Sequence, residues 1–289
     1  MRALKKVNFS RISRLSGLFA LGAVFAASGC SLVDKDQAIK NNVQAGKACV
    51  MCDLRYKSFR GMYLDGIDLR GAYLFNTNLE RTSMVGANLE SAAMVLTDME
   101  RSDLTGANLA KANMQRAILF GATLRDADMT VVNLAEANME ATELTGANLT
   151  TANMSHAILT DVFANNSDMR SADLSNANMV NANLRAANLQ GANLAGADLS
   201  GANLTMTNLG NASLRGADLS GATLNYANLR GADLTGVKLI GATINGANLK
   251  QARFNGADLT DAKISSVVKF QTDFCKAKMP AGEPGECLK

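Results

Sequence analysis

Large hydrophobic residues recur at every fifth position through most of this 289-residue chain. From Leu54 to Ile264, the positions whose numbers end in 4 or 9 comprise 43 residues, and all but Ala164 are Leu, Met, Ile or Phe. The positions two residues earlier, from 72 to 262, hold 29 Ala and ten Thr, Ser or Val. Asn or Asp usually lies between the two, Gly is common before the small residue, and no insertion shifts this register.

A period of five fits neither regular element. On an α-helix, five residues advance the chain by about 140° beyond a full turn, so the large residues would point in every direction. On a flat strand, an odd period would place successive large residues on opposite faces. The pattern therefore predicts a chain that bends every five residues and returns each large residue to one interior. The small residue also points inward, and Asn, Asp and Gly supply the corners.

These A(N/D)LxG repeats resemble those of the pentapeptide-repeat proteins, over residues 52–264. The resemblance implies an all-β fold, a right-handed quadrilateral β-helix with four pentads in each coil. The repeats would make about 11 coils and, with about 4.8 Å between stacked strands, a rod roughly 50 Å long. We expect a β-helix over residues 49–264 and a C-terminal cap over residues 265–289.

The first 30 residues have the parts of an export signal, a basic start and an apolar stretch, Leu15–Ala27, that is too short to span a bilayer. Residues 27–30 (Ala-Ser-Gly-Cys) resemble the lipobox of bacterial lipoproteins. The resemblance implies a signal peptide over residues 1–29, cleavage between Gly29 and Cys30, and lipid on Cys30. Several acyl chains on one residue would anchor the protein stably. The alternative is an ordinary signal peptide with Cys30 as a plain mature cysteine.

The segment after the predicted cleavage site is polar and lacks the repeat. We expect residues 30–48 to be a lipid-anchored tether, part of which could form a short helix that caps the first coil. Ser31 follows the lipidated cysteine where Asp would imply retention in the inner membrane. We therefore expect a cell-envelope protein on the outer membrane, with its rod in the periplasm or exposed at the surface.

The net charge of +3 belongs to the leader. Residues 1–29 hold five basic and no acidic residues, so the rest of the chain has a net charge of −2. The apparent basicity is therefore no argument for a nucleic-acid partner, and we expect none. The predicted partners are the membrane, through the lipid on Cys30, and an envelope protein or a second copy of this chain.

The resemblance extends to the cysteines near both ends. Residues 49–54 (Cys-Val-Met-Cys-Asp-Leu) are similar to the opening of many family members, and residues 274–280 with Cys287 to a common closing segment. The rod that the resemblance implies puts Cys49 and Cys52 at one end, and Cys275 and Cys287 at the other. Because the Cα atoms of a disulfide lie within about 7 Å, this rod implies one bond at each end, in keeping with an oxidising location. The other reading of Cys49 and Cys52, a redox pair or half of a zinc site, lacks a thioredoxin-like context and further ligands.

Catalytic chemistry is poorly represented in the chain. His156 is the single histidine, which excludes a histidine cluster, and no nucleophile, base and orienting group form a set. We expect no enzyme activity, no cofactor and no metal site. Nine inward positions between 84 and 179 are Met, which suits Cu(I) but is more simply an adaptable core.

Two features of the outer surface are candidate binding sites. With 20 residues in each coil, Asn and Asp stack at positions 108, 128, 148, 168, 188, 208, 228 and 248, which we interpret as a ladder of turn residues rather than a glycan-binding comb. Ile118, Phe120, Ile158 and Phe163 fall where most pentads have polar residues. They are either a contact patch for a partner or scattered surface residues, with Phe163 turned inward beside Ala164.

Three functions are therefore open. The first is a non-catalytic, lipid-anchored rod that serves as a scaffold or interaction module, which the leader and the lack of catalytic groups favour. The second is DNA mimicry, as in the pentapeptide-repeat proteins that protect topoisomerases. It needs an acidic cytoplasmic rod, whereas residues 54–264 have a net charge of only −3. The third is an enzyme or a glycan-binding surface, for which no cleft is evident.

Overall fold

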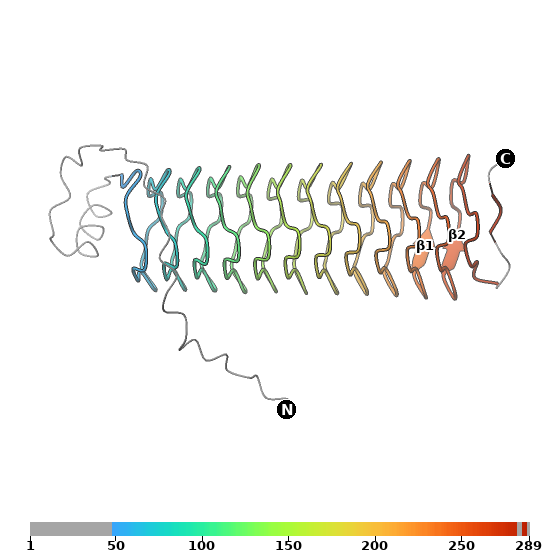
Figure 1. Ribbon diagram of the computed structural model, residues 1–289, viewed down its shortest axis with the longest axis horizontal. Helices are drawn as coiled ribbons and strands as arrows, with labels where there is room; N and C mark the ends of the chain where they lie inside the picture. Colours follow the sequence, from blue (N-terminus) through green and yellow to red (C-terminus); the bar gives the residue numbers. More distant parts are fainter. Residues whose placement is uncertain (1–47, 282–284, 288–289) are drawn as a thin grey trace, which may run out of the picture. The chain divides into compact units, whose positions relative to one another are not determined.

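The structure, a computed structural model, describes residues 48–281 and 285–287. The chain divides into two units, Met1–Val33 and Asp34–Lys289, and all the described residues belong to the second. Residues 48–281 wind into one stack of similar coils (Figure 1). The predicted signal peptide, the lipidation site Cys30 and the predicted capping helix lie outside the described residues.

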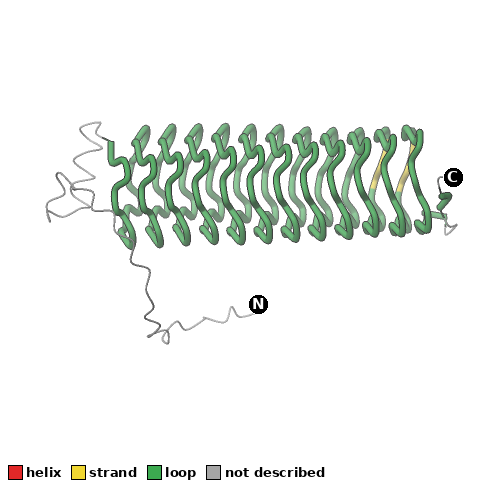
Figure 2. The backbone as a smooth tube through the Cα atoms, turned by 45° about the horizontal axis from the view of Figure 1, so that its top comes forward, coloured by secondary structure: helices red, strands yellow, loops and turns green. Residues whose placement is uncertain are grey.

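Each coil contains 20 residues and has four walls. Every residue from 53 to 258 whose number ends in 3 or 8 pairs, in parallel, with the residue 20 positions later. The pairs form four columns, which we name wall A (Tyr63 to Lys263), wall B (Asp68 to Val268), wall C (Asp53 to Asp273) and wall D (Ser58 to Lys278). Two pieces of wall A are long enough to count as strands, β1 (Thr243–Asn245) and β2 (Lys263–Ser265), which pair in parallel. The remaining described backbone consists of bridges and turns (Figure 2).

The corners between walls all use one backbone conformation. All 46 residues whose numbers end in 1 or 6, from Met51 to Lys276, have a positive φ between 51° and 73°. Only 17 of them are glycine, the residue that adopts this left-handed region without strain. The five-residue period of the sequence is therefore the spacing of left-handed corners.

The hydrogen bonds of one pentad explain why Asn and Asp recur. In residues 108–112, the N–H of Asn108 donates to the preceding coil, and those of Leu109 and Lys111 donate to the next coil, over 2.6–2.9 Å. The N–H of Ala112 closes the corner on the carbonyl of Leu109, over 3.0 Å. The remaining N–H, that of Ala110, donates to the side-chain Oδ1 of Asn108, over 3.0 Å. The Asn or Asp thus accepts the one backbone N–H that neither the neighbouring coils nor the corner uses.

The predicted core is confirmed. Of the 43 large positions, all but the partly buried Ile264 are buried, and so are all 39 small positions. Where the small residue is Thr, its hydroxyl usually donates to a carbonyl of the preceding coil, as from Thr77 Oγ1 to Leu54 O over 2.9 Å. Such bonds let a hydroxyl replace a methyl group inside the tube without an unsatisfied polar atom.

The coil continues past the predicted boundary at residue 264. Bridges still form at Val268, Asp273 and Lys278, and the corner at Lys276 is left-handed. The ring of Phe274 stacks on that of Phe254, with centroids 4.9 Å apart. Residues 265–281 therefore continue the coil, with the partly buried Phe274 and Met279 packed against the core, whereas Lys269 at the equivalent position is exposed. The chain end lies against this coil, where the N–H of Gly285 donates to the carbonyl of Ala277 over 2.7 Å.

Candidate functional site

The Asn and Asp column on wall B is a structural ladder. At all eight positions from 108 to 248, the side-chain Oδ1 accepts the backbone N–H two residues later, over 3.0–3.3 Å. From Asn208 to Asn248, each side-chain amide also donates to the Asn Oδ1 one coil earlier. The interpretation as turn residues is therefore confirmed for this column. Each Oδ1 in this column therefore already accepts a backbone hydrogen bond, which leaves fewer acceptors for a ligand.

The candidate apolar patch is divided between two walls. Ile118 and Ile158 lie on wall D, two coils apart with Asn138 between them, and both are about 40% exposed. Phe120 lies beside them at the edge of wall D, where the Arg101 guanidinium carbon is 5.7 Å from the ring centroid. Phe163 belongs to wall A, around the next corner. The structure thus groups Ile118, Phe120 and Ile158 but turns Phe163 onto a neighbouring face.

Phe163 does not fill the space beside Ala164. Its side chain is 47% exposed, whereas Ala164 is completely buried. The backbone of Phe163 bridges Glu143 and Asn183 like every other outward residue of wall A. The register of the column therefore holds Phe163 outward, and the interpretation in which it turns inward is wrong.

Three of the four outward apolar residues replace a hydrogen-bond acceptor. Ile118, Ile158 and Phe163 occupy the position at which Asn or Asp accepts the N–H two residues later. Their side chains have no oxygen, so they forgo a bond that is worth about 1 kcal/mol when partly buried. This local cost makes them stronger candidates for a contact role than their exposure alone indicates.

Glutamates on the first coils of wall D are paired with arginines. Glu80 lies 3.0 Å from Arg60 and 3.4 Å from Arg81, and Glu100 lies 3.6 Å from Arg101. These pairs join neighbouring coils or adjacent residues, and all the arginines are about half exposed. We therefore read this part of wall D as a solvated surface with neutralised charge rather than an acid–base site.

Asp68, Asp168 and Asp233 are three of the five carboxyl groups whose pKa values are lowered. Hydrogen bonds from the Arg70 and Arg170 guanidinium groups lower the pKa of Asp68 and Asp168 on wall B. Burial alone would raise the pKa of Asp233, but hydrogen bonds from its neighbours, including Arg215, outweigh burial and leave it lowered. All three groups favour the charged form, which suits structural ion pairs and not a general acid.

The second half of the stack has an uneven charge distribution. On walls A and B between residues 182 and 271 there is no Asp or Glu, and the charged residues are all basic: Arg185, Arg230, Lys250, Lys263 and Lys269. Walls C and D carry the acidic residues of these coils, such as Asp198, Asp218 and Asp233. We name residues 182–251 of walls A and B the amide-rich face, because Asn and Gln are its most frequent polar side chains.

The amide-rich face contains a hollow on wall B. Its volume is about 390 Å³, and its walls include Gln190, Asn211, Arg230 and Gln251. Gly210 forms part of its floor. Every side chain that lines the hollow is polar, and none is acidic.

The nine methionines between positions 84 and 179 are completely buried, which confirms their place in the core. His156 lies at an exposed corner. Within residues 48–281 and 285–287, no three His, Cys, Asp or Glu residues gather closely enough to hold a metal ion. In the same part of the chain, no helix has the length and apolar character to cross a membrane.

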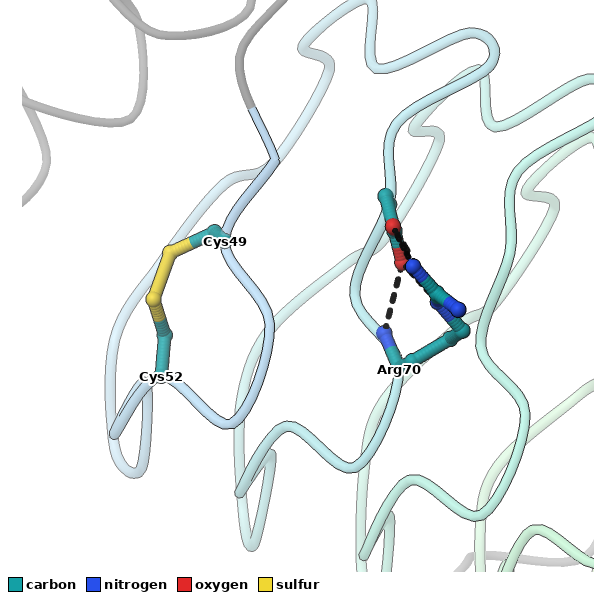
Figure 3. The surroundings of a disulfide bond; sticks show 4 residues. Cys49, Cys52 and Arg70 are labelled. Carbon is teal, nitrogen blue, oxygen red and sulfur yellow. Dashed lines mark hydrogen bonds and ion pairs between the residues drawn. A yellow bond between two sulfur atoms is a disulfide. The ribbon is translucent and has the colours of Figure 1, made fainter.

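Both expected disulfides are present, one at each end of the described stack. Cys49 and Cys52 are bonded across the first corner, where Figure 3 shows them near Arg70. Cys275 and Cys287 join the last coil to the chain end. These bonds constrain the first and last coils of the described stack.

Comparison with known proteins bears on the whole repeat region. A family model described as pentapeptide repeats matches residues 52–90, 97–134, 122–161, 133–170, 167–205, 204–240 and 232–268. The chain belongs to the pentapeptide repeat family. Its fold is accordingly the right-handed quadrilateral β-helix that the repeats predict, in agreement with the four walls and the absence of helix from the described residues.

Solved structures of family members give further matches. HetL, from the cyanobacterium Nostoc sp. strain PCC 7120 and involved in heterocyst differentiation regulation, is 30% identical, with 85% of this chain and 97% of HetL covered and a TM-score of 0.32. A trypsin-treated form of QnrB1, a plasmid-mediated fluoroquinolone resistance protein, is 22% identical, with 54% of this chain and 85% of that chain covered and a TM-score of 0.36. No curated protein matches the chain.

Sequence reasoning missed the hollow and the acid-free walls of this pentapeptide repeat protein. The signal for the hollow is a single glycine, Gly210, at a pentad position that is not a corner. The signal for the acid-free walls is visible only when the sequence is sorted by wall, since each wall contributes one pentad in four. The net charge of a continuous segment sums all four walls, so it does not reveal that walls A and B lack acidic residues between residues 182 and 271 while walls C and D carry them.

Proposed function

We propose that this pentapeptide repeat protein is a lipid-anchored envelope protein that presents its rod as a non-catalytic scaffold or interaction module. The observation that carries the proposal is the lipobox-like sequence at residues 27–30, which completes an apolar stretch of signal-peptide length. Cleavage before Cys30 leaves 18 residues between the lipidated cysteine and Cys49, where the described stack begins its first corner. Such a tether lets the rod stand away from the membrane surface.

The described rod supports an interaction role more than a catalytic one. Its interior is filled by two sets of apolar side chains, and its walls repeat the same short pentads without long loop insertions. Ile118, Phe120 and Ile158 supply an apolar contact surface on wall D. The expected partner there is an envelope protein or a second copy of this chain.

Intact mass of the native protein from fractionated membranes tests the anchor. We expect a chain that begins at Cys30, carries acyl mass, and is four hydrogens lighter before reduction than after it. A Cys30→Ser variant serves as the control and should lose both the acyl mass and the membrane fraction. An unacylated soluble wild-type chain would overturn the proposal.

DNA mimicry receives less support. A duplex carries one negative charge for about every 1.7 Å of its axis on all sides. Walls A and B between residues 182 and 271 contain no acidic residue, so half of the rod surface there is basic or neutral. A DNA-mimicking role would have to use only the first coils or walls C and D.

A further inference from the structure

We propose that the amide-rich face binds an acidic glycan, a saccharide chain bearing carboxylates, and that the hollow above Gly210 seats one of its sugars. The proposal goes beyond the scaffold role and does not depend on the lipid anchor. It rests on the glycine at the floor of the hollow, on the groups that line the hollow, and on the absence of acidic residues from the surrounding walls.

Gly210 has no backbone reason to be glycine. It is the only glycine in residues 48–281 that does not occupy a left-handed corner. The equivalent positions one coil before and one coil after, Gln190 and Arg230, carry long side chains on the same backbone path. The effect of glycine at 210 is therefore to remove a side chain between them, and this opens the hollow.

The lining of the hollow suits hydroxyl groups and a carboxylate. The amides of Gln190, Asn211 and Gln251 offer paired donors and acceptors, which match the hydroxyls of a sugar. Arg230 contributes a guanidinium, whose planar donors bind a carboxylate in a bidentate manner. Among the described residues, Arg230 has no carboxylate within salt-bridge distance, in contrast to Arg70 and Arg170 on the same wall.

An exposed aromatic ring borders the same face. Tyr226 is 65% exposed at the corner between walls A and B, and its ring lies over Gly246, where an added Cβ would come within 2.6 Å of the ring. A ring held in this way offers an apolar edge or face to a sugar. Lys250 adds a second cation one coil beyond Arg230. A ligand that runs along the stack would meet these groups on successive coils.

The charge density favours an acidic glycan over a nucleic acid. The amide-rich face has three cations, Arg185, Arg230 and Lys250, against many amides and hydroxyls. Tight binding of a duplex requires a basic group for many of its closely spaced phosphates. Binding of single strands requires a series of aromatic rings, whereas this face has only Tyr226.

Titration of the full-length chain with a six-residue oligogalacturonate tests the proposal. The neutral galactose hexamer is the control for charge. A single-stranded DNA of similar charge is the control for the type of ligand. We expect the acidic hexamer to bind at least tenfold more tightly than either of the others. Equal affinity for the neutral hexamer, tighter binding of the DNA, or no binding of the acidic hexamer at millimolar concentration would overturn the proposal.

Variants locate the site. Gly210→Gln fills the hollow with the side chain found at position 190, and Arg230→Gln removes the cation. Each variant should bind the acidic hexamer at least tenfold more weakly than the wild type does. Ala110→Gln, in the same column five coils earlier, and Lys238→Gln, on wall D, are the controls and should bind as the wild type does.

Folding of the variants can be verified independently. A Cβ at position 210 would lie 3.2 Å from Asn208 Oδ1, a contact that a shift of a few tenths of an ångström relieves. Circular dichroism and a melting curve should match the wild type for Gly210→Gln. Arg230→Gln changes only an exposed side chain and tests the site even if Gly210→Gln unfolds. Wild-type affinity in Arg230→Gln would overturn the proposal.

Discussion

The corners of residues 126–186 and of residues 191–256 have the same backbone but different residues. Of the 13 corners in the first region, only Gly146 is glycine, whereas ten of the 14 corners in the second are glycine. The non-glycine corners of the first region have φ between 54° and 61°, and the glycine corners of the second between 64° and 70°. The first region also has methionine at many inward positions, whereas the inward positions from 184 to 259 contain none.

The comparison shows that stacking, rather than local preference, sets the corner conformation. Val131 is β-branched and disfavours a positive φ, yet its N–H donates to Thr150 O over 3.0 Å, much as Gly221 donates to Ile240 O over 2.8 Å. The ladder between coils therefore outweighs the local cost at each corner. We infer that the first region stores strain that the second avoids.

The largest expected effect comes from crowding the core. Ala192→Leu places three extra carbons at a completely buried position and should lower the free energy of unfolding by about 1–3 kcal/mol or more. Ala157→Leu, in the methionine-rich region, should cost less, because unbranched methionines such as Met154 adjust to a new neighbour. Urea unfolding of both variants measures the difference. An equal loss of unfolding free energy in both variants would contradict the expected difference in core packing between the two regions. Wild-type stability in Ala192→Leu would contradict it as well.

The second effect concerns a glycine corner. Gly221 has φ +69° and open space around its α-carbon, so Gly221→Val introduces backbone strain without a clash. We expect a loss of about 1–2 kcal/mol in the free energy of unfolding. Gly221→Asn is the control, because Asn tolerates this conformation, and it should lose much less. Equal melting temperatures of the two variants would contradict the prediction that valine strains this corner.

The reverse substitution should give a smaller gain. Val131→Gly relieves the positive φ of an exposed corner residue but raises the entropy of the unfolded chain. The net stabilisation should be about 0.5 kcal/mol, since the relief of roughly 1–2 kcal/mol is partly offset. A thermal melt at constant pH detects it. Destabilisation of the variant would show that the Val131 side chain adds no strain to this corner.

The smallest effect is a pH dependence on wall B. The Arg170 hydrogen bond lowers the folded-state pKa of Asp168, so its contribution to stability is complete above the unfolded-state pKa and is lost as the pH falls through the folded-state pKa. Asp168→Asn keeps the acceptor for the Arg170 N–H, as Asn148 and Asn188 do in the same column. The variant should lose stability less steeply than the wild type in acid, by well under 1 kcal/mol. Parallel acid-unfolding curves would show that the pair contributes nothing.

The sequence was sufficient for the interior of the protein. Because each left-handed corner resets the chain direction after five residues, the period alone identifies the inward large residue and the inward small residue. It also identifies the Asn or Asp between them, although it could not show that this side chain accepts the N–H two residues later. The predicted disulfides depended on the family resemblance, since the cysteine spacing alone leaves three pairings open.

The assignment of each pentad to a wall did not follow from the five-residue period. A five-residue period does not state how many pentads close a coil, and the 20-residue spacing was expected only from the family resemblance. The structure shows that residues 20 apart pair through backbone hydrogen bonds, such as Leu109 N to Asp128 O. Side chains such as Ile118 and Ile158 therefore share a wall, and Phe163 does not.

The sequence by itself determined which side chains fill the tube, because their spacing is local and each corner repeats it. Only the tertiary structure decided what the outside presents, because each wall is assembled from one pentad in four. The stacking of coils also held Phe163 outward, extended the solenoid through residue 281, and left Gly210 as a gap between two long side chains. Surface sites on this rod depend on hydrogen bonds between coils, which join residues that are distant in the chain.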